Sequence, residues 1–139
     1  MNAKSIMIPI ILVLVIIGGC SSKYKLTSSN EMNPSDFYSP GAIKQVQETY
    51  TGGQITSTVS VMQFSDESSA TNGITQLKEL YNPAMIGLDT KYVNYKELSP
   101  GSQFYFYKSG KYVIHITLSG DKSNGDAFVE WYYSKYPNK

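Results

Sequence analysis

Four side chains on two neighbouring segments have types that could form a small binding site. Tyr105 and Tyr107 alternate with phenylalanines in the run FYFY, and His115 and Thr117 follow in the next apolar run. His115 is the only histidine of the chain, and imidazole is the side chain whose ordinary pKa lies closest to neutral pH. Tyrosine offers a flat apolar ring with a polar tip, which suits sugars, peptides or protein partners. One hypothesis is therefore a ligand-binding surface made of these four residues. The alternative is structural: His115 would be a half-buried strand residue with a hydrogen bond, and the tyrosines would only cover the sheet.

No catalytic or metal-binding pattern accompanies these residues. The chain lacks a glycine-rich phosphate loop, a G-x-S-x-G elbow and an H-E-x-x-H motif. Zinc and copper sites use several His or Cys ligands, and the chain has one of each. Asp121 and Asp126 flank a Ser-Asn-Gly turn but lack the ligand spacing of a calcium-binding loop. The sequence therefore predicts a protein that is not an enzyme and that binds no metal or cofactor.

The composition favours an exported domain and excludes a nucleic-acid binder. The 12 basic residues are all lysines and face 11 acidic residues, so the formal net charge is +1. A nucleic-acid-binding surface needs a basic excess and usually arginine forks for phosphate. A single cysteine allows no internal disulfide, so an apolar core alone must hold the domain together.

The N-terminus has the organisation of a secretory signal. Lys4 supplies a positive charge, and residues 6–17 read IMIPIILVLVII without a charged or hydrogen-bonding side chain. As a helix this run would be about 18 Å long, which is short of the roughly 30 Å hydrocarbon layer. Gly18 and Gly19 then supply the small residues of a cleavage point, just before Cys20.

The residues Ile17-Gly18-Gly19-Cys20 resemble the lipobox of prokaryotic lipoproteins. The resemblance implies cleavage between Gly19 and Cys20 and a lipid on Cys20 that anchors the protein to the membrane. Two acyl chains hold a protein on a bilayer nearly permanently, at about 0.8 kcal/mol per buried methylene group. The alternative is an uncleaved anchor helix that ends at Cys20, and both interpretations place the domain outside the cytoplasm.

The chain is expected to have three parts: a lipoprotein signal peptide over 1–19, the lipidated cysteine with a flexible tether over 20–40, and a single domain over 41–139. The tether has few branched apolar residues and two prolines, so it buries too little surface to offset its chain entropy. Twenty flexible residues reach about 25 Å, which would hold the domain clear of the lipid headgroups.

The domain is expected to begin with a hairpin and a helix. Gly52-Gly53 lies between two runs rich in Thr, Val and Ile, which favours a two-residue turn that pairs Thr51 with Gln54. The helix is expected to start at Ser65 or Asp66 and to stop before Pro83. Apolar residues of both elements are expected to form the core, namely Val46, Tyr50, Ile55, Val59 and Val61 in the hairpin and Ala70, Ile74, Leu77 and Tyr81 in the helix.

The second β region is expected to contain three strands. The run 108–110 (Lys-Ser-Gly) fits a bulged turn that pairs Tyr107 with Lys111. That register puts His115 on the tyrosine side of the FYFY strand. A plain two-residue Ser-Gly turn would instead put His115 on the phenylalanine side, and the bulged turn is preferred because it gives one uniformly apolar face.

The last expected element is a helix that starts near Ser123 or Asn124 and stops before Pro137. Its apolar side is expected to contain Ala127, Phe128, Trp131 and Tyr132. The order β-β-α-β-β-β-α predicts an α+β fold, with an antiparallel sheet of about five strands and both helices on one face. This element order is loosely similar to that of PsbP- and Mog1-like domains.

The predicted function is a small binding or interaction module at the cell envelope. It would be held in the membrane by a lipid on Cys20, would face away from the cytoplasm, and would bind an envelope protein or a small ligand. The alternative is an accessory or structural subunit of a membrane complex. A less favoured alternative is a hydrolase or isomerase that uses His115.

Overall fold

The computed structural model describes residues 23–34, 40–88 and 91–135. In these ranges the chain forms one antiparallel sheet of seven strands and two helices, which confirms the expected α+β class. The strand order across the sheet is β1-β2-β3-β7-β6-β5-β4. The predicted signal peptide and Cys20 lie outside the described residues. Neither described helix is long and apolar enough to cross a membrane.

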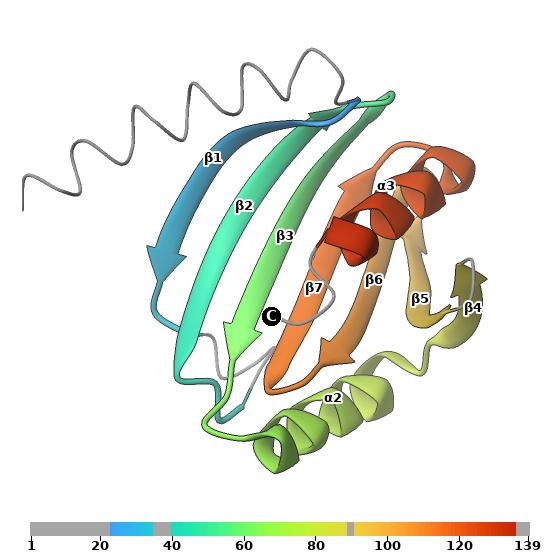
Figure 1. The fold of residues 1–139 in the computed structure, drawn as a ribbon. Coiled ribbons are helices and arrows are strands. Elements are labelled where there is room, and N and C mark those ends of the chain that lie inside the picture. The colour runs from blue at the N-terminus through green and yellow to red at the C-terminus, as the bar shows by residue number, and fades with distance from the viewer. Residues whose placement is uncertain (1–22, 35–39, 89–90, 136–139) are drawn as a thin grey trace, which may run out of the picture.

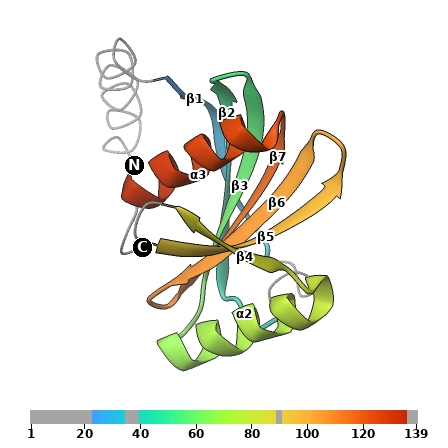
Figure 2. The same cartoon turned by 90° about the vertical axis from the view of Figure 1, so that its right-hand side faces the viewer.

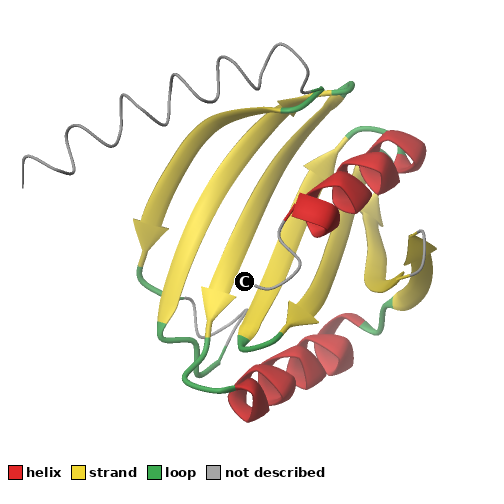
Figure 3. Cartoon of the chain, in the orientation of Figure 1, coloured by secondary structure: helices red, strands yellow, loops and turns green. Residues whose placement is uncertain are grey.

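The sheet has two more strands than the sequence predicted, and the extra ones are β1 and β4. Figure 1 and Figure 3 show long, curved strands on one side of the sheet and a short β4 at the opposite edge. In chain order the elements are β1 (Lys25–Met32), β2 (Lys44–Gly52), β3 (Ile55–Gln63), α2 (Glu67–Tyr81), β4 (Ala84–Leu88), β5 (Lys91–Ser99), β6 (Ser102–Ser109), β7 (Tyr112–Ser119) and α3 (Lys122–Lys135).

Strand β1 corrects the expectation of a flexible tether over 20–40. It pairs with β2 from Lys25↔Thr51 to Met32↔Gln45, although nearly all of its side chains are exposed. An edge strand is held by main-chain hydrogen bonds on one side and needs no apolar alternation, so the polar composition misled the prediction. A bulge interrupts the pairing at Thr27, whose hydroxyl donates to the Thr49 carbonyl at 3.1 Å.

The two helices contact opposite faces of the sheet, which corrects the expectation that both cover one face. Side chains alternate between the faces along a strand. On β6, Phe104 and Phe106 belong to the buried cluster that contains α2, whereas Tyr105 and Tyr107 belong to the cluster that contains α3. We call these sides the phenylalanine face and the tyrosine face. Figure 2 shows α3 and α2 well apart, near opposite ends of the central strands.

Helix α2 follows the predicted local signals closely. The Asp66 side chain caps its N-terminus by accepting from the Ser69 N–H at 2.7 Å, and Asn82 ends it in a left-handed conformation before Pro83. Of the expected apolar stripe, Ala70, Ile74 and Leu77 are buried and Tyr81 is half-buried. Gly73 allows close packing, because a Cβ atom there would lie 2.7 Å from the Phe64 ring.

The first hairpin has the predicted faces but not the predicted turn. Gly52 pairs with Ile55, so the turn is Gly53-Gln54, and both turn residues have positive φ angles of 59° and 63°. The register therefore moves by two positions, which leaves every side chain on its expected face. Gly52 is the last residue of β2, where glycine lets the main chain of Lys23 pack closely. A Cβ atom at this position would collide with the carbonyl oxygen of Lys23.

The second hairpin contradicts the predicted bulge. Ser109 pairs with Tyr112 across a two-residue turn, Gly110-Lys111, in which Gly110 has a φ angle of 59°. His115 consequently pairs with Phe106 and lies on the phenylalanine face. Glycine at the first turn position matches the twist of a tight hairpin, so no bulge is required.

Helix α3 begins at Lys122, close to the predicted start, because the Asp121 side chain accepts from the Asn124 N–H at 2.8 Å. Phe128 and Tyr132 are buried as expected, whereas Ala127 is exposed. The small residue on the buried side of α3 is Gly125 instead of Ala127. A Cβ atom there would lie 2.8 Å from the Tyr105 hydroxyl, so glycine lets the helix approach the sheet.

Candidate functional site

The four residues of the predicted binding surface do not form one surface. Tyr105 and Tyr107 lie on the tyrosine face, and His115 and Thr117 lie on the phenylalanine face with their cross-strand neighbours. The bulged turn assumed from the sequence would have changed the register by an odd number of residues, which moves a strand's side chains to the other face. Of the four residues, only Thr117 is exposed.

Both tyrosines of the predicted surface are core residues beneath α3. Tyr105 is fully buried, and its hydroxyl donates to Asp126 Oδ1 at 2.7 Å. Tyr107 is 3% exposed and stacks on Tyr133 with the ring centroids 4.5 Å apart. Burial raises the pKa of both phenols above the ordinary value of 10, so they stay protonated. Their role is to join α3 to the sheet.

His115 is buried on the phenylalanine face of the sheet, which is the face that α2 contacts. It is 6% exposed, and its ring meets that of Phe104 edge-on at 5.6 Å. Burial disfavours the charged imidazolium and lowers the pKa of His115 to about 3. The imidazole is therefore neutral at physiological pH, which does not favour the predicted role as a proton carrier.

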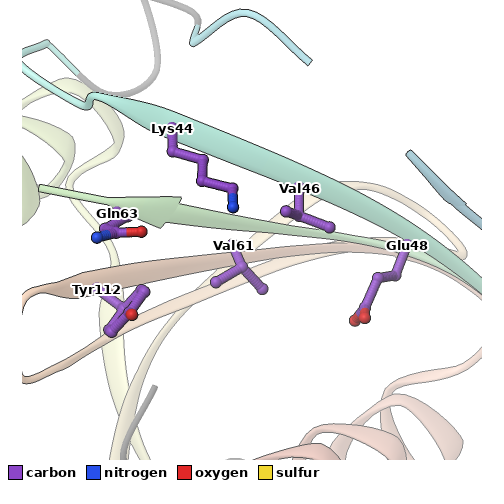
Figure 4. Close-up of a pocket in the computed structure, with 6 residues that line it drawn as sticks. All are labelled: Lys44, Val46, Glu48, Val61, Gln63 and Tyr112. Atoms are coloured by element: carbon purple, nitrogen blue, oxygen red, sulfur yellow. The ribbon is translucent and has the colours of Figure 1, made fainter. Parts of the chain in front are cut away.

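An open groove of about 210 Å³ lies on the tyrosine face, beyond the part that α3 covers. Its walls come from β2, β3 and β7, as Figure 4 shows. The lining residues are Lys44, Val46, Glu48, Val61, Gln63 and Tyr112. Two valines and a tyrosine ring thus give it apolar walls, with a lysine and a glutamate at different points along β2.

Glu48 is the most unusual residue of the groove, because its carboxylate is held inside the protein. The residue is 8% exposed, and its Oε1 accepts from the Tyr132 hydroxyl at 2.7 Å and from the Tyr50 hydroxyl at 3.2 Å. None of the ion pairs between described residues involves Glu48. Among the described residues, the Glu48 carboxylate therefore has hydroxyl donors but forms no ion pair with a cationic side chain.

Lys44 lies on the same face of β2 as Glu48, because side chains repeat every second residue along a strand. They are four positions apart, so their Cα atoms are about 13 Å apart along the strand. The Lys44 Nζ is 3.8 Å from Glu31 Oε2, and both side chains are largely exposed. An exposed pair of this kind contributes little, typically about 0–1 kcal/mol, so Lys44 remains able to meet a ligand.

This groove was not predicted from the sequence, although a signal for Glu48 was present. Glu48 is in phase with Val46 and Tyr50, the residues expected on the apolar side of the first hairpin. A carboxylate in phase with buried residues is unusual, because acidic side chains are rarely buried without a partner. Its two tyrosine partners could not be found from the pattern, since Tyr132 is distant in the chain.

A second surface feature lies on the β4–β5 hairpin, at the sheet edge far from β1. Met85 and Tyr92 are 56% and 70% exposed and lie on the same face of the hairpin. The Tyr92 ring passes 3.7 Å from the position of a Cβ atom on Gly87. These residues form an exposed apolar patch that could contact another protein.

The described residues contain no group of three or more His, Cys, Asp or Glu side chains placed to hold a metal ion. The two aspartates that suggested calcium have structural contacts instead. Asp121 caps α3, and Asp126 accepts from Tyr105 and, at 2.6 Å, from Lys122 Nζ.

Comparisons with protein-family models, curated proteins and solved structures found no match to this chain.

Proposed function

We propose that the protein is a lipid-anchored, extracytoplasmic binding module whose groove takes a small ligand with a positively charged nitrogen. The observation that supports this proposal is the Glu48 carboxylate, which is 8% exposed and lines the groove. A buried carboxylate is costly unless hydrogen bonds or an opposite charge compensate it. Tyr50 and Tyr132 supply hydrogen bonds, and a ligand ammonium group would supply the charge.

The rest of the groove suggests how such a ligand would lie. Val46 and Val61 offer apolar contacts for an alkyl or aromatic body next to the charged end. Lys44 would repel a second ammonium group and attract an anionic or polar end, so a ligand would bind in one direction. The preferred ligand is therefore an amine with an apolar middle part.

The sequence supports the anchor part of the proposal. The lipobox-like Ile17-Gly18-Gly19-Cys20 follows a hydrophobic run too short for a permanent span. A domain delivered in this way faces the outside of the cytoplasmic membrane, where it could capture a solute or bind an envelope component.

An amine titration tests the groove. Hexylammonium is expected to shift the NMR signals of groove residues around Glu48 in the full-chain protein more strongly than hexanoate at the same concentration does. Glu48→Gln keeps an oxygen that accepts from both tyrosines but removes the charge. It should weaken hexylammonium binding by about ten-fold or more, since hydrogen bonds to charged groups contribute about 1.5–3 kcal/mol.

The matched control is Glu79→Gln, which removes an exposed carboxylate from α2 on the other side of the sheet. This variant should bind hexylammonium as the wild type does. Equal binding of hexylammonium and hexanoate, or equal binding by the Glu48→Gln and wild-type proteins, would contradict a cation-binding groove.

Mass spectrometry of the membrane-extracted protein tests the anchor. We expect an N-terminus at Cys20 that carries the mass of a lipid, because the lipobox-like residues place the cleavage before this cysteine. The Cys20→Ser variant should lack the lipid mass. An intact Met1 on the native protein would show that the leader is retained and would remove the basis for lipidation.

An accessory subunit of a membrane complex is the second candidate, and the exposed Met85 and Tyr92 favour it. Large apolar side chains exposed together are common at protein interfaces. The amine titration separates the two candidates, because an accessory subunit needs no occupied groove.

A further inference from the structure

We infer that the surface around Tyr24 lies against the lipid headgroups and binds an anionic membrane. This inference rests on the proposed lipid at Cys20, and it adds a defined orientation of the domain to that anchor. The residues of this surface, which we call the anchor surface, are Lys23, Lys25, Trp131 and Lys135. Three features support it: the short length of chain before Tyr24, the charges next to this residue and the aromatic rings that pack on it.

Very little chain separates Cys20 from the folded domain. Tyr24 is four residues further on, and a chain of that length spans at most about 14 Å even when fully extended. Tyr24 cannot leave the domain to lengthen this connection, because it is 6% exposed and packs on Phe128 and Trp131. The centroid of its ring lies 5.0 Å from the centroid of each of those rings. A lipid on Cys20 would therefore hold the domain at the headgroup layer, rather than about 25 Å away on a free tether.

Three lysines lie close to this short connection: Lys23 directly before Tyr24, Lys25 directly after it, and Lys135 beside Trp131. Lys23 Nζ lies 5.8 Å from the centroid of the Tyr24 ring, and Lys135 Nζ lies 4.8 Å from that of the Trp131 ring. Lys25 is exposed at the start of β1. Glu130, next to Trp131 in the chain, is exposed and opposes their attraction to an anionic leaflet, but the three lysines outnumber it.

The aromatic residues of the anchor surface also suit a membrane boundary. Trp131 is half-buried, with one part packed on Tyr24 and another part open to solvent. Tryptophan and tyrosine are enriched at the level of the lipid headgroups, where one end of the ring is apolar and the other is wet. In Figure 1 the start of β1 and the β2–β3 turn lie together at one end of the sheet, which would face the bilayer.

Trp131 is the only tryptophan of the chain, so its fluorescence reports directly on this surface. The native lipidated protein is extracted from membranes, its lipid on Cys20 is checked by mass spectrometry, and it is reconstituted into phosphatidylcholine vesicles with or without phosphatidylglycerol. Both vesicle types contain lipids with a quencher near the headgroup. We expect strong quenching of Trp131 in the anionic vesicles, and relief of that quenching by high salt, because salt screens exposed charges.

Lysine variants test the electrostatic part. Lys23→Gln and Lys25→Gln should each lower the ratio of docked to undocked protein by about five-fold, since a lysine near an anionic leaflet contributes about 1 kcal/mol. Lys111→Gln is the matched control. Lys111 is exposed in the β6–β7 turn, which lies at the end of β7 far from the β2–β3 turn. This variant should be quenched as strongly as the wild type.

The outcomes separate this inference from the proposed anchor. Lipid on Cys20 together with unquenched Trp131 in anionic vesicles would overturn the inference while the anchor stands. The same holds if Lys111→Gln weakens quenching as much as Lys23→Gln does. If Cys20 carries no lipid, the anchor and the inference fall together.

Discussion

Replacement of Tyr24 by alanine is expected to lower the free energy of unfolding by about 3–5 kcal/mol, the usual range for removing a buried aromatic ring. The ring is 6% exposed and joins the start of the chain's folded part to Phe128 and Trp131 of α3. Its loss leaves a cavity under α3 and releases the contact that fixes the start of β1. Urea denaturation followed by the fluorescence of Trp131 measures the change.

Tyr92→Ala is the matched control for this prediction. Tyr92 is 70% exposed on β5, so its removal should change the free energy of unfolding by no more than about 0.5 kcal/mol. If Tyr24→Ala were as mild as Tyr92→Ala, the segment before β2 would behave as the tether that its composition suggested.

The second large effect is a loss of stability in mild acid that depends on His115. The pKa of His115 is lowered by burial to about 3 in the folded protein, whereas that of an unfolded histidine is about 6.5. Below pH 6.5 the unfolded chain binds a proton that the folded protein does not bind. The free energy of unfolding should therefore be highest above pH 6.5 and should fall by about 1.4 kcal/mol per pH unit as the pH drops toward 3.

The pH range from 6.5 to 4.5 suits the measurement. Hydrogen bonds from Ser69 and Lys108 lower the pKa values of Asp66 and Glu67, so these two carboxyl groups titrate below this range. Over these two pH units the wild type should lose about 2–3 kcal/mol. His115→Gln should lose much less over the same range, whatever its stability at pH 7. An imidazole NMR signal that titrates near pH 6.5 in the folded protein would contradict the predicted burial effect.

The parts of the fold that depend on local signals could be predicted from the sequence. Helix α2 is the clearest case, because Asp66, the apolar spacing and Pro83 fix its start, its buried side and its end within one segment. The apolar side of the first hairpin was also predicted correctly. Alternation along a strand is a local property, and the actual turn differs from the expected one by an even change of register.

The errors arose where a distant part of the chain decides the structure. The turn is Gly53-Gln54 rather than Gly52-Gly53, and the main chain of Lys23 packs directly against Gly52. β1 escaped prediction because main-chain pairing with β2 holds a strand whose side chains remain in water. The face of His115 depended on whether the β6–β7 turn contains an even or odd number of residues, which the sequence left open between two choices.

The candidate site was harder to predict than the fold. The sequence directed attention to the tyrosines of FYFY because strands were assumed to have one buried side. β6 and β7 are covered on both faces, so these rings are core residues. The actual groove depends on Glu48 and Tyr132, whose hydrogen bond of 2.7 Å joins β2 to α3 although the two residues are 84 positions apart in the sequence.

The proposed lipid on Cys20 would crowd identical copies of the chain on a membrane, and the bulge at Thr27 would then matter for how neighbouring copies meet. Molecules confined to a surface meet side by side. Among the described residues β1 pairs with β2 alone, and the outer edge of such a strand would offer each neighbour a template for intermolecular sheet growth. The extra residue disrupts the regular ladder and twists the strand locally, while Lys25 and Glu31 place charges near its two ends. We expect this irregular edge to protect the protein from aggregation when the proposed lipid holds it on a membrane.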